Sequence, residues 1–157
     1  PPVAGHTVGE GIGDLKGKTW VTRGNVFVDR IACGWLIRRF VDEAAAFKFV
    51  PGARYTPKPD EVRFDMYDGE YTHEGDRCTF EVMIQRLQIR DHALGPLAEV
   101  VHDIDLKDGK FGRRETDGFS ALLTGLAAAH PEDDRRMAEG FRLFDSLYAY
   151  FQRRKRE

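Results

Sequence analysis

The sequence has little sulfur and no long apolar run. It contains two cysteines, Cys33 and Cys78, in 157 residues, which is too few for a secreted disulfide scaffold. No apolar stretch approaches the roughly 20 residues that cross a bilayer, and the start lacks the basic-then-apolar pattern of a signal peptide. We therefore expect a cytoplasmic protein without a membrane partner, whose thiols are buried or act as ligands.

Neither sign of charge dominates the sequence. Lysine and arginine number 24, aspartate and glutamate number 26, and the net charge is -2. This balance excludes a strongly basic nucleic-acid module, so we expect no nucleic-acid binding by this domain itself. GxGxxG after a strand, GxxxxGK(S/T), HExxH and GxSxG are also absent, which leaves dinucleotide-binding, P-loop, zincin and hydrolase functions without support.

The length fits one domain that buries roughly two-thirds of its unfolded surface, so a metal is not required for folding. Residues 1–17 hold five glycines and two prolines, which predicts a flexible lead-in or linker. A single domain over residues 18–157 follows. Because the first residue is proline rather than methionine, we expect an upstream domain that is missing from this chain.

Apolar spacing predicts a mainly helical α+β fold with about five helices packed on a small sheet. Strands are expected at 18–23, 47–50 and 62–66; helices are expected over 29–42, from residue 79, over 91–106, over 118–130, and along the last segment. The last helix carries an aromatic stripe. We expect it to be buried internally, and pairing with a second copy, a homodimer, is the alternative.

The stretch "THEGDRCTFE", residues 72–81, raises the question of a metal site. His73 on a loop and Glu81 in a first helical turn can converge with His102 and Asp105, which are three apart on one helix face. Two imidazoles and two carboxylates suit one divalent ion: iron, manganese or zinc. Without a metal, Glu81 favours the helix dipole, Thr79 or Asp76 caps that helix, and His102 is a hydrogen-bonded core residue.

Three further side chains keep more than one role. Cys78 adjoins a helix N-terminus, which lowers a thiol pKa and favours it as an extra ligand. Cys33 is a small buried hydrophobe, a ligand, or the redox partner of Cys78. Asp29 stands on an apolar stripe, where a carboxylate is costly unless partnered. It caps its helix, pairs with Arg38 or Arg39, or completes the metal shell.

Arginines cluster around the first expected helix. Arg23, Arg38 and Arg39, with Arg30, can hold a tetrahedral oxyanion through their planar guanidinium groups. Solvated charge or surface ion pairs worth under about 1 kcal/mol each are the alternative.

Five segments of the sequence together resemble a known family. "TWVTR", "VDRIACGWLIRRFVD", "THEGDRCTFE", "VHDIDL" and "GFSALLTGL" look like the C-terminal domain of ChrB-type chromate resistance proteins, over about residues 18–150. The resemblance implies a bacterial cytoplasmic domain, associated with chromate efflux operons and belonging to a chromate-responsive regulator. The motifs that recur in this family contain the proposed ligands Asp29, His73, Glu81, His102 and Asp105. This strengthens the metal hypothesis.

Three functions follow as hypotheses. The first is a metal-binding, chromate-responsive domain, in which the arginines draw chromate or a similar oxyanion to an open metal position. The second is a metal-dependent enzyme with redox activity, such as chromate reduction. The third has no ion, and the same side chains make only structural hydrogen bonds.

Overall fold

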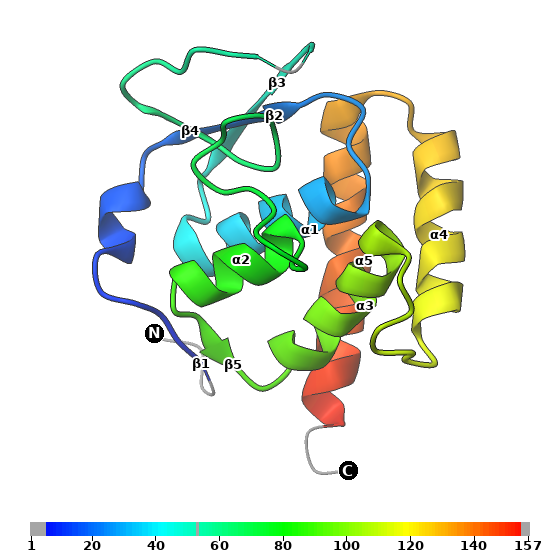
Figure 1. The fold of residues 1–157 in the computed structure, drawn as a ribbon. Helices are drawn as coiled ribbons and strands as arrows, with labels where there is room; N and C mark the ends of the chain where they lie inside the picture. The colour runs from blue at the N-terminus through cyan, green and yellow to red at the C-terminus, as the bar shows by residue number, and fades with distance from the viewer. Residues whose placement is uncertain (1–5, 53, 155–157) are drawn as a thin grey trace.

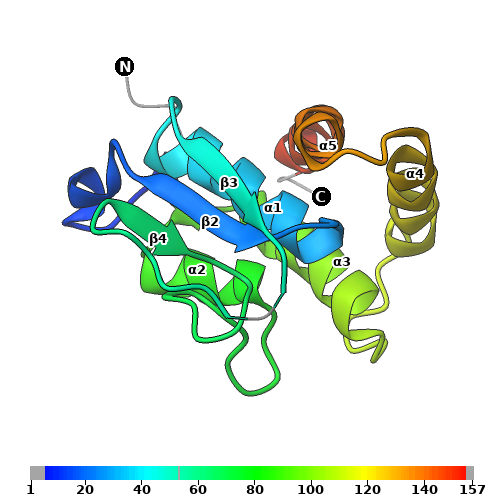
Figure 2. The ribbon, with the colours of Figure 1, turned by 90° about the horizontal axis from the view of Figure 1, so that it is seen from above.

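A three-stranded parallel sheet forms one side of the molecule. The computed structural model describes residues 6–52 and 54–154. β2 (Thr19–Arg23) lies in the centre, between β3 (Ala46–Val50) and β4 (Glu61–Arg63). The predicted strands are thus found, although the third ends at Arg63, and Phe64 makes only an isolated bridge with Tyr71. Figures 1 and 2 show the helices gathered on one side of this sheet.

Five α-helices lie within the described residues, so the predicted α+β class, mainly helical with a small sheet, is confirmed. The first helix, α1, continues into a short π-helical stretch, η2, and the two together correspond to the helix expected over 29–42. The bounds are α1 Val28–Leu36, η2 Ile37–Val41, α2 Thr79–Arg86, α3 Leu94–Leu106, α4 Thr116–Ala129 and α5 Asp133–Arg153.

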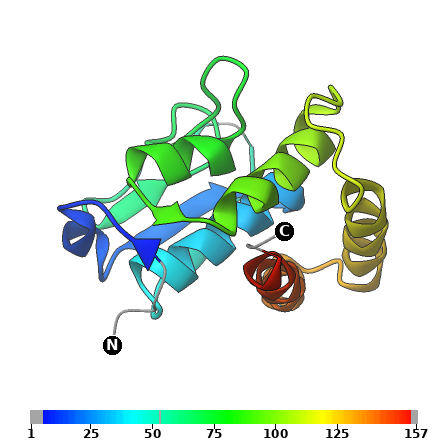
Figure 3. The ribbon, with the colours of Figure 1, turned by 90° about the horizontal axis from the view of Figure 1, so that it is seen from below.

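The core lies between the helices and one face of the sheet. α1 contacts α2, α3 and α5 and so occupies the centre of the helical layer. Trp20 and Trp35 belong to this core. The aromatic stripe of α5 is buried internally, with Phe144, Tyr148 and Phe151 at most 2% exposed, as the sequence favoured. α4 lies outermost, against α3 and α5 (Figures 1 and 3).

The segment before the sheet packs on the domain. Residues 1–5 of the predicted flexible lead-in lie outside the described residues, but the rest of it makes defined contacts. β1 (His6–Thr7) pairs antiparallel with β5 (Arg90–Asp91), and a 3-10 turn, η1, spans Ile12–Leu15. The Gly17 amide then donates to Asp42. Across residues 6–52 and 54–154, no helix has both the length and the apolar character to span a membrane.

Candidate metal centre

The first turn of α2 organises the candidate centre. Its first two amides, of Thr79 and Phe80, donate to Asp29 of α1 at 3.0 and 2.9 Å. Asp29 therefore caps α2, not its own helix, and both its oxygens meet amides that the helix leaves unpaired. Asp29 is 3% exposed, and these bonds offset the cost of burying its charge. Of the roles open to Asp29, the structure thus gives it a cap, but on a second helix.

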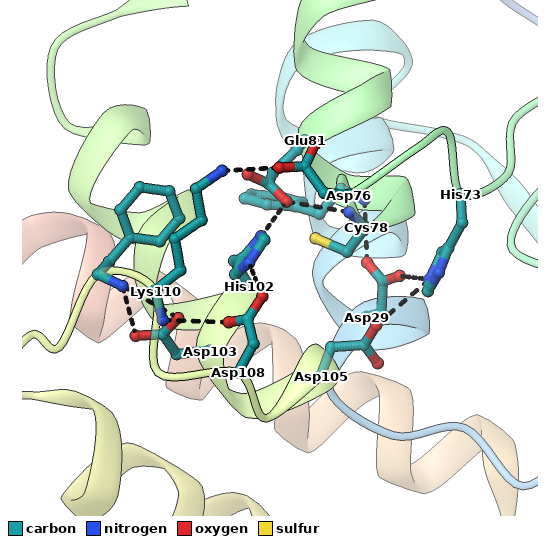
Figure 4. Close-up of polar contacts among 12 residues, drawn as sticks. Asp29, His73, Asp76, Cys78, Glu81, His102, Asp103, Asp105, Asp108 and Lys110 are labelled. Atoms are coloured by element: carbon teal, nitrogen blue, oxygen red, sulfur yellow. Dashed lines mark hydrogen bonds and ion pairs between the residues drawn. The ribbon is translucent and has the colours of Figure 1, made fainter.

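His73 lies where three carboxylates meet. Its Nε2 atom is 3.0 Å from Asp29 Oδ2, 3.2 Å from Asp105 Oδ2 and 3.6 Å from Asp65 Oδ1. The loop between β4 and α2 brings His73 there, and the α3 helix brings Asp105 (Figure 4). The ligand atoms of Asp29, His73 and Asp105 all lie within 4.8 Å of one another. We call these three residues the His73 group.

The electrostatics of this group favour a positive charge between the carboxylates. The hydrogen bond to Asp29, together with the charges of Asp29, Asp65 and Asp105, raises the pKa of His73 to about 9. Burial and the nearby Asp29 raise the pKa of Asp65 and of Asp105 to about 6. The carboxylates thus resist sharing a confined space while each is ionised. A cation among them relieves that repulsion.

His102 lies in a second, closed group. Its fully buried side chain contacts Glu81 through Nδ1 at 2.6 Å and Asp108 through Nε2 at 2.9 Å. The same Glu81 oxygen accepts the Cys78 amide, so Glu81 caps α2 as well. Burial lowers the pKa of His102, but the hydrogen bonds to Glu81 and Asp108 outweigh burial and raise it. We call Cys78, Glu81, His102 and Asp108 the His102 group.

The six predicted ligands therefore come together, but in two sets. Asp29, His73 and Asp105 form one set, and Cys78, Glu81 and His102 form another within 4.8 Å. His102 also forms a set with Asp103 and Asp108. Among the residues that the structure describes, no such set joins His73 and Asp105 to Glu81 and His102. The single four-residue shell expected from the sequence is thus divided.

Comparison with known proteins bears on this arrangement. The model of the ChrB C-terminal domain matches residues 20–151. The chain belongs to this family. It is 37% identical over 150 residues to Protein ChrB of Cupriavidus metallidurans, covering 95% of this chain and 45% of that protein. The chain thus spans less than half the length of this curated relative. No solved structure matches it significantly.

Cys33 and Cys78 are both buried. Burial raises the pKa of the Cys78 thiol, and the nearby charge of Asp29 raises it further. The expectation of a lowered pKa is therefore wrong, because loss of solvent outweighs the hydrogen bond that the Glu81 backbone amide, in the first turn of α2, donates to the sulfur. The pKa of Cys33 is also raised by burial, and its sulfur lies 3.7 Å from Asp29 Oδ1. Both thiols therefore stay protonated in the folded protein, and neither readily supplies a thiolate ligand.

Of the expected arginines, only Arg30 pairs with a carboxylate of this site among the described residues: its Nε atom lies 3.6 Å from Asp65 Oδ2. Arg38 donates twice to the Ala45 carbonyl, at 3.1 and 2.8 Å. Arg39 pairs with Asp145 at 2.9 Å and lies over the Tyr148 ring. Both follow Asp29 by more than two helical turns, which places them roughly 13 Å away along the helix axis. Arg23 ends β2 and is exposed.

Sequence reasoning missed two acidic residues beside these histidines, Asp65 and Asp108. Asp65 follows β4 with a left-handed φ of 49°, and Arg30 donates to its carbonyl at 3.0 Å. Asp65 carried no signal in the sequence, because the strand expected at 62–66 contains it and its φ is known only from the structure. Asp108 gave none, because only the turn after α3 brings it back to His102.

Proposed function

We propose that this chain is a metal-binding, chromate-responsive domain of a bacterial chromate resistance protein, acting in the cytoplasm as the sensing or effector part of a regulator. The observation that carries the proposal is the meeting of three carboxylates at His73 Nε2. Family membership supports chromate resistance as the setting.

The proton count at His73 favours an ion. Nε2 of His73 carries at most one N–H, whether the ring is neutral or protonated, and one N–H points well at only one oxygen. Three carboxylates lie within 3.6 Å of that nitrogen. Two ligands held at right angles about 2.1 Å from a metal ion lie about 3.0 Å apart. The Nε2 distances to Asp29 and Asp105 are 3.0 and 3.2 Å, which suits such a shell.

The His102 group fits a supporting role. Each ring nitrogen of His102 has one carboxylate partner, so two N–H groups of an imidazolium satisfy both. This pairing joins α2, α3 and the turn that carries Asp108. His102 precedes Asp105 by three residues on α3, so the same pairing holds the Asp105 side of the site. We therefore assign the ion to the His73 group and the positioning of α3 to His102.

The donor set narrows the choice of ion. One imidazole and two carboxylates suit manganese or iron(II), and zinc remains a competitor. The side chain of His73 is 42% exposed, so a coordination position faces solvent. Chromate or a similar oxyanion would enter there, beside Arg30. Its binding would shift the start of α1, where Asp29 lies, and so an attached domain.

Metal uptake tests the proposal. Purified protein is stripped with a chelator, titrated with manganese, iron(II) or zinc, and compared with His73→Ala and with the exposed His92→Ala as control. The wild type and His92→Ala should take up one ion per chain, and His73→Ala should lose at least 100-fold in affinity. Equal uptake by wild type and His73→Ala, or none by either, contradicts the proposal. Chromate binding is then measured with and without the ion.

An enzyme is the second candidate, favoured by the same exposure of His73. Three protein ligands with an open position are typical of catalytic metal sites. Consumption of chromate with a supplied electron donor such as NADH, present in the loaded wild type and lost in His73→Ala, would support it. Absence of turnover in the fully loaded protein leaves the sensor function alone.

A further inference from the structure

α4 is apolar in composition but poorly covered. Of its 14 residues, only Phe119 and Leu123 are buried. Its side chains are mostly leucine, alanine and glycine, and its outward positions carry no charge beyond the first turn. A helix that is apolar on most of its surface normally lies inside a protein. Figure 2 shows α4 at the edge of the helical layer, with its outer side uncovered by other elements.

The exposed apolar positions form one continuous face. They recur at steps of three and four, as side chains on one side of a helix do. Leu122 lies at the centre and is 59% exposed, the largest value for a large hydrophobic side chain among the described residues. A methyl group added at Gly118 or Gly125 would meet no atom within 4 Å. The α4 face consists of Gly118, Ala121, Leu122, Gly125, Ala128 and Ala129.

We propose that two copies of the chain associate through the α4 face, with the two helices antiparallel about a twofold axis. Such an axis between residues 123 and 124 places Leu122 of each copy opposite Gly125 of the other. Gly125 leaves the space that the Leu122 side chain fills. The small residues on either side let the two helix backbones approach closely. The face is thus complementary to itself, which a dimer about a twofold axis requires.

Charges at the two ends of α4 specify the antiparallel direction. Arg114 precedes the helix with a side chain 70% exposed, although it also reaches Glu115 and Tyr150. Glu132 follows the helix and is exposed. Antiparallel packing places Arg114 of one copy beside Glu132 of the second copy, twice. Parallel packing would place like charges together and align the two helix dipoles unfavourably.

The size of the face sets the expected strength. A 14-residue helix is about 21 Å long, so the contact lies at the small end of specific interfaces. We therefore expect a reversible dimer with a dissociation constant in the micromolar range. This dimer does not use the α5 stripe, which is buried within the domain.

Sedimentation equilibrium of the full chain, from low to several hundred micromolar, tests the dimer. The wild type should shift from monomer to dimer with concentration, and Leu122→Glu should remain monomeric throughout. Tyr67→Glu, which alters a similarly exposed apolar side chain elsewhere (58%), should dimerise as the wild type does. Ala128→Glu replaces Leu122→Glu as the test if the latter lowers Tm.

A charge swap tests the direction of packing. Arg114→Glu and Glu132→Arg should each weaken the dimer several-fold, and the double variant should restore it. A wild type that is monomeric at every concentration, or a Leu122→Glu variant that still dimerises, overturns the proposal. Failure of the double variant to recover overturns the antiparallel arrangement. If the wild type is monomeric, a different domain replaces the second copy as the candidate partner of the α4 face.

Discussion

The two histidine groups lie side by side at the start of α2 and contrast in every respect that matters for binding an ion. His102 is fully buried, and each ring nitrogen has one carboxylate. His73 is 42% exposed, and one nitrogen faces three carboxylates. In the first group protons and acceptors are matched, which favours structure. In the second, three carboxylates lie around a single Nε2 that carries at most one N–H, which favours a cation.

Replacing His102 with alanine should have the largest effect on stability. The change leaves a cavity and removes the imidazole partner of both Glu81 and Asp108, which should lower the free energy of unfolding by about 3 kcal/mol. Urea denaturation of the metal-free protein measures this. His92→Ala, at an exposed histidine, should stay within about 0.5 kcal/mol of wild type. Equal losses in both variants would remove the distinction between the groups.

Replacing His73 with alanine should affect metal affinity more than stability, the reverse of the expectation for His102→Ala. Because its side chain is partly exposed, the loss of stability should be smaller than for His102→Ala. Metal affinity should fall by at least 100-fold, whereas His102→Ala, where it folds, should keep one ion per chain with affinity about 10-fold weaker. Calorimetric titration with manganese gives both values. If the losses of affinity are exchanged, the ion belongs to the His102 group.

The dependence of metal binding on pH sharpens the contrast. In the metal-free state the pKa of His73 is raised to about 9 from 6.5, so its stabilising charge is fully present below 6.5 and lost as the pH rises through 9. The ion must displace that proton. Affinity should therefore rise by up to about tenfold per pH unit between roughly 6.5 and 9. Calorimetry in buffers of different ionisation enthalpy should show one proton released there, and a flat profile contradicts this.

Cys78→Ser should have the smallest effect. Cys78 belongs to the His102 group, and its thiol is kept protonated by burial. With the ion in the His73 group, metal affinity should change by less than about threefold, within the usual range for a residue without a ligand role. A loss comparable to that of His73→Ala would show that sulfur binds the ion.

The sequence predicted the elements better than the way they meet. Periodicity located the five helices because each buries one face, and α2 begins at Thr79 as expected. The role of Asp29 was left open because its partners lie on α2, about 50 positions along the chain. Spacing could not separate two neighbouring sites from one, since both use α2 and α3.

Two errors have simple physical causes. Arg38 and Arg39 are close to Asp29 in sequence, but the helical chain carries them past the opposite end of α1 and into η2. For Cys78 the sequence reveals the helix N-terminus, which lowers the thiol pKa, and conceals the burial, which raises it more. Resemblance to a family indicated what local patterns did not, namely that the separate motifs carrying the candidate ligands belong to one domain.

The Asp29 carboxylate has one further consequence. Its two oxygens are shared between the amides of Thr79 and Phe80 and any ion that His73 helps to hold. Charge drawn toward an ion weakens the attraction felt by those two amide protons. The nuclear magnetic resonance chemical shifts of these two amide protons would then change when the ion binds. They would report how much of the protein holds an ion, without an added dye.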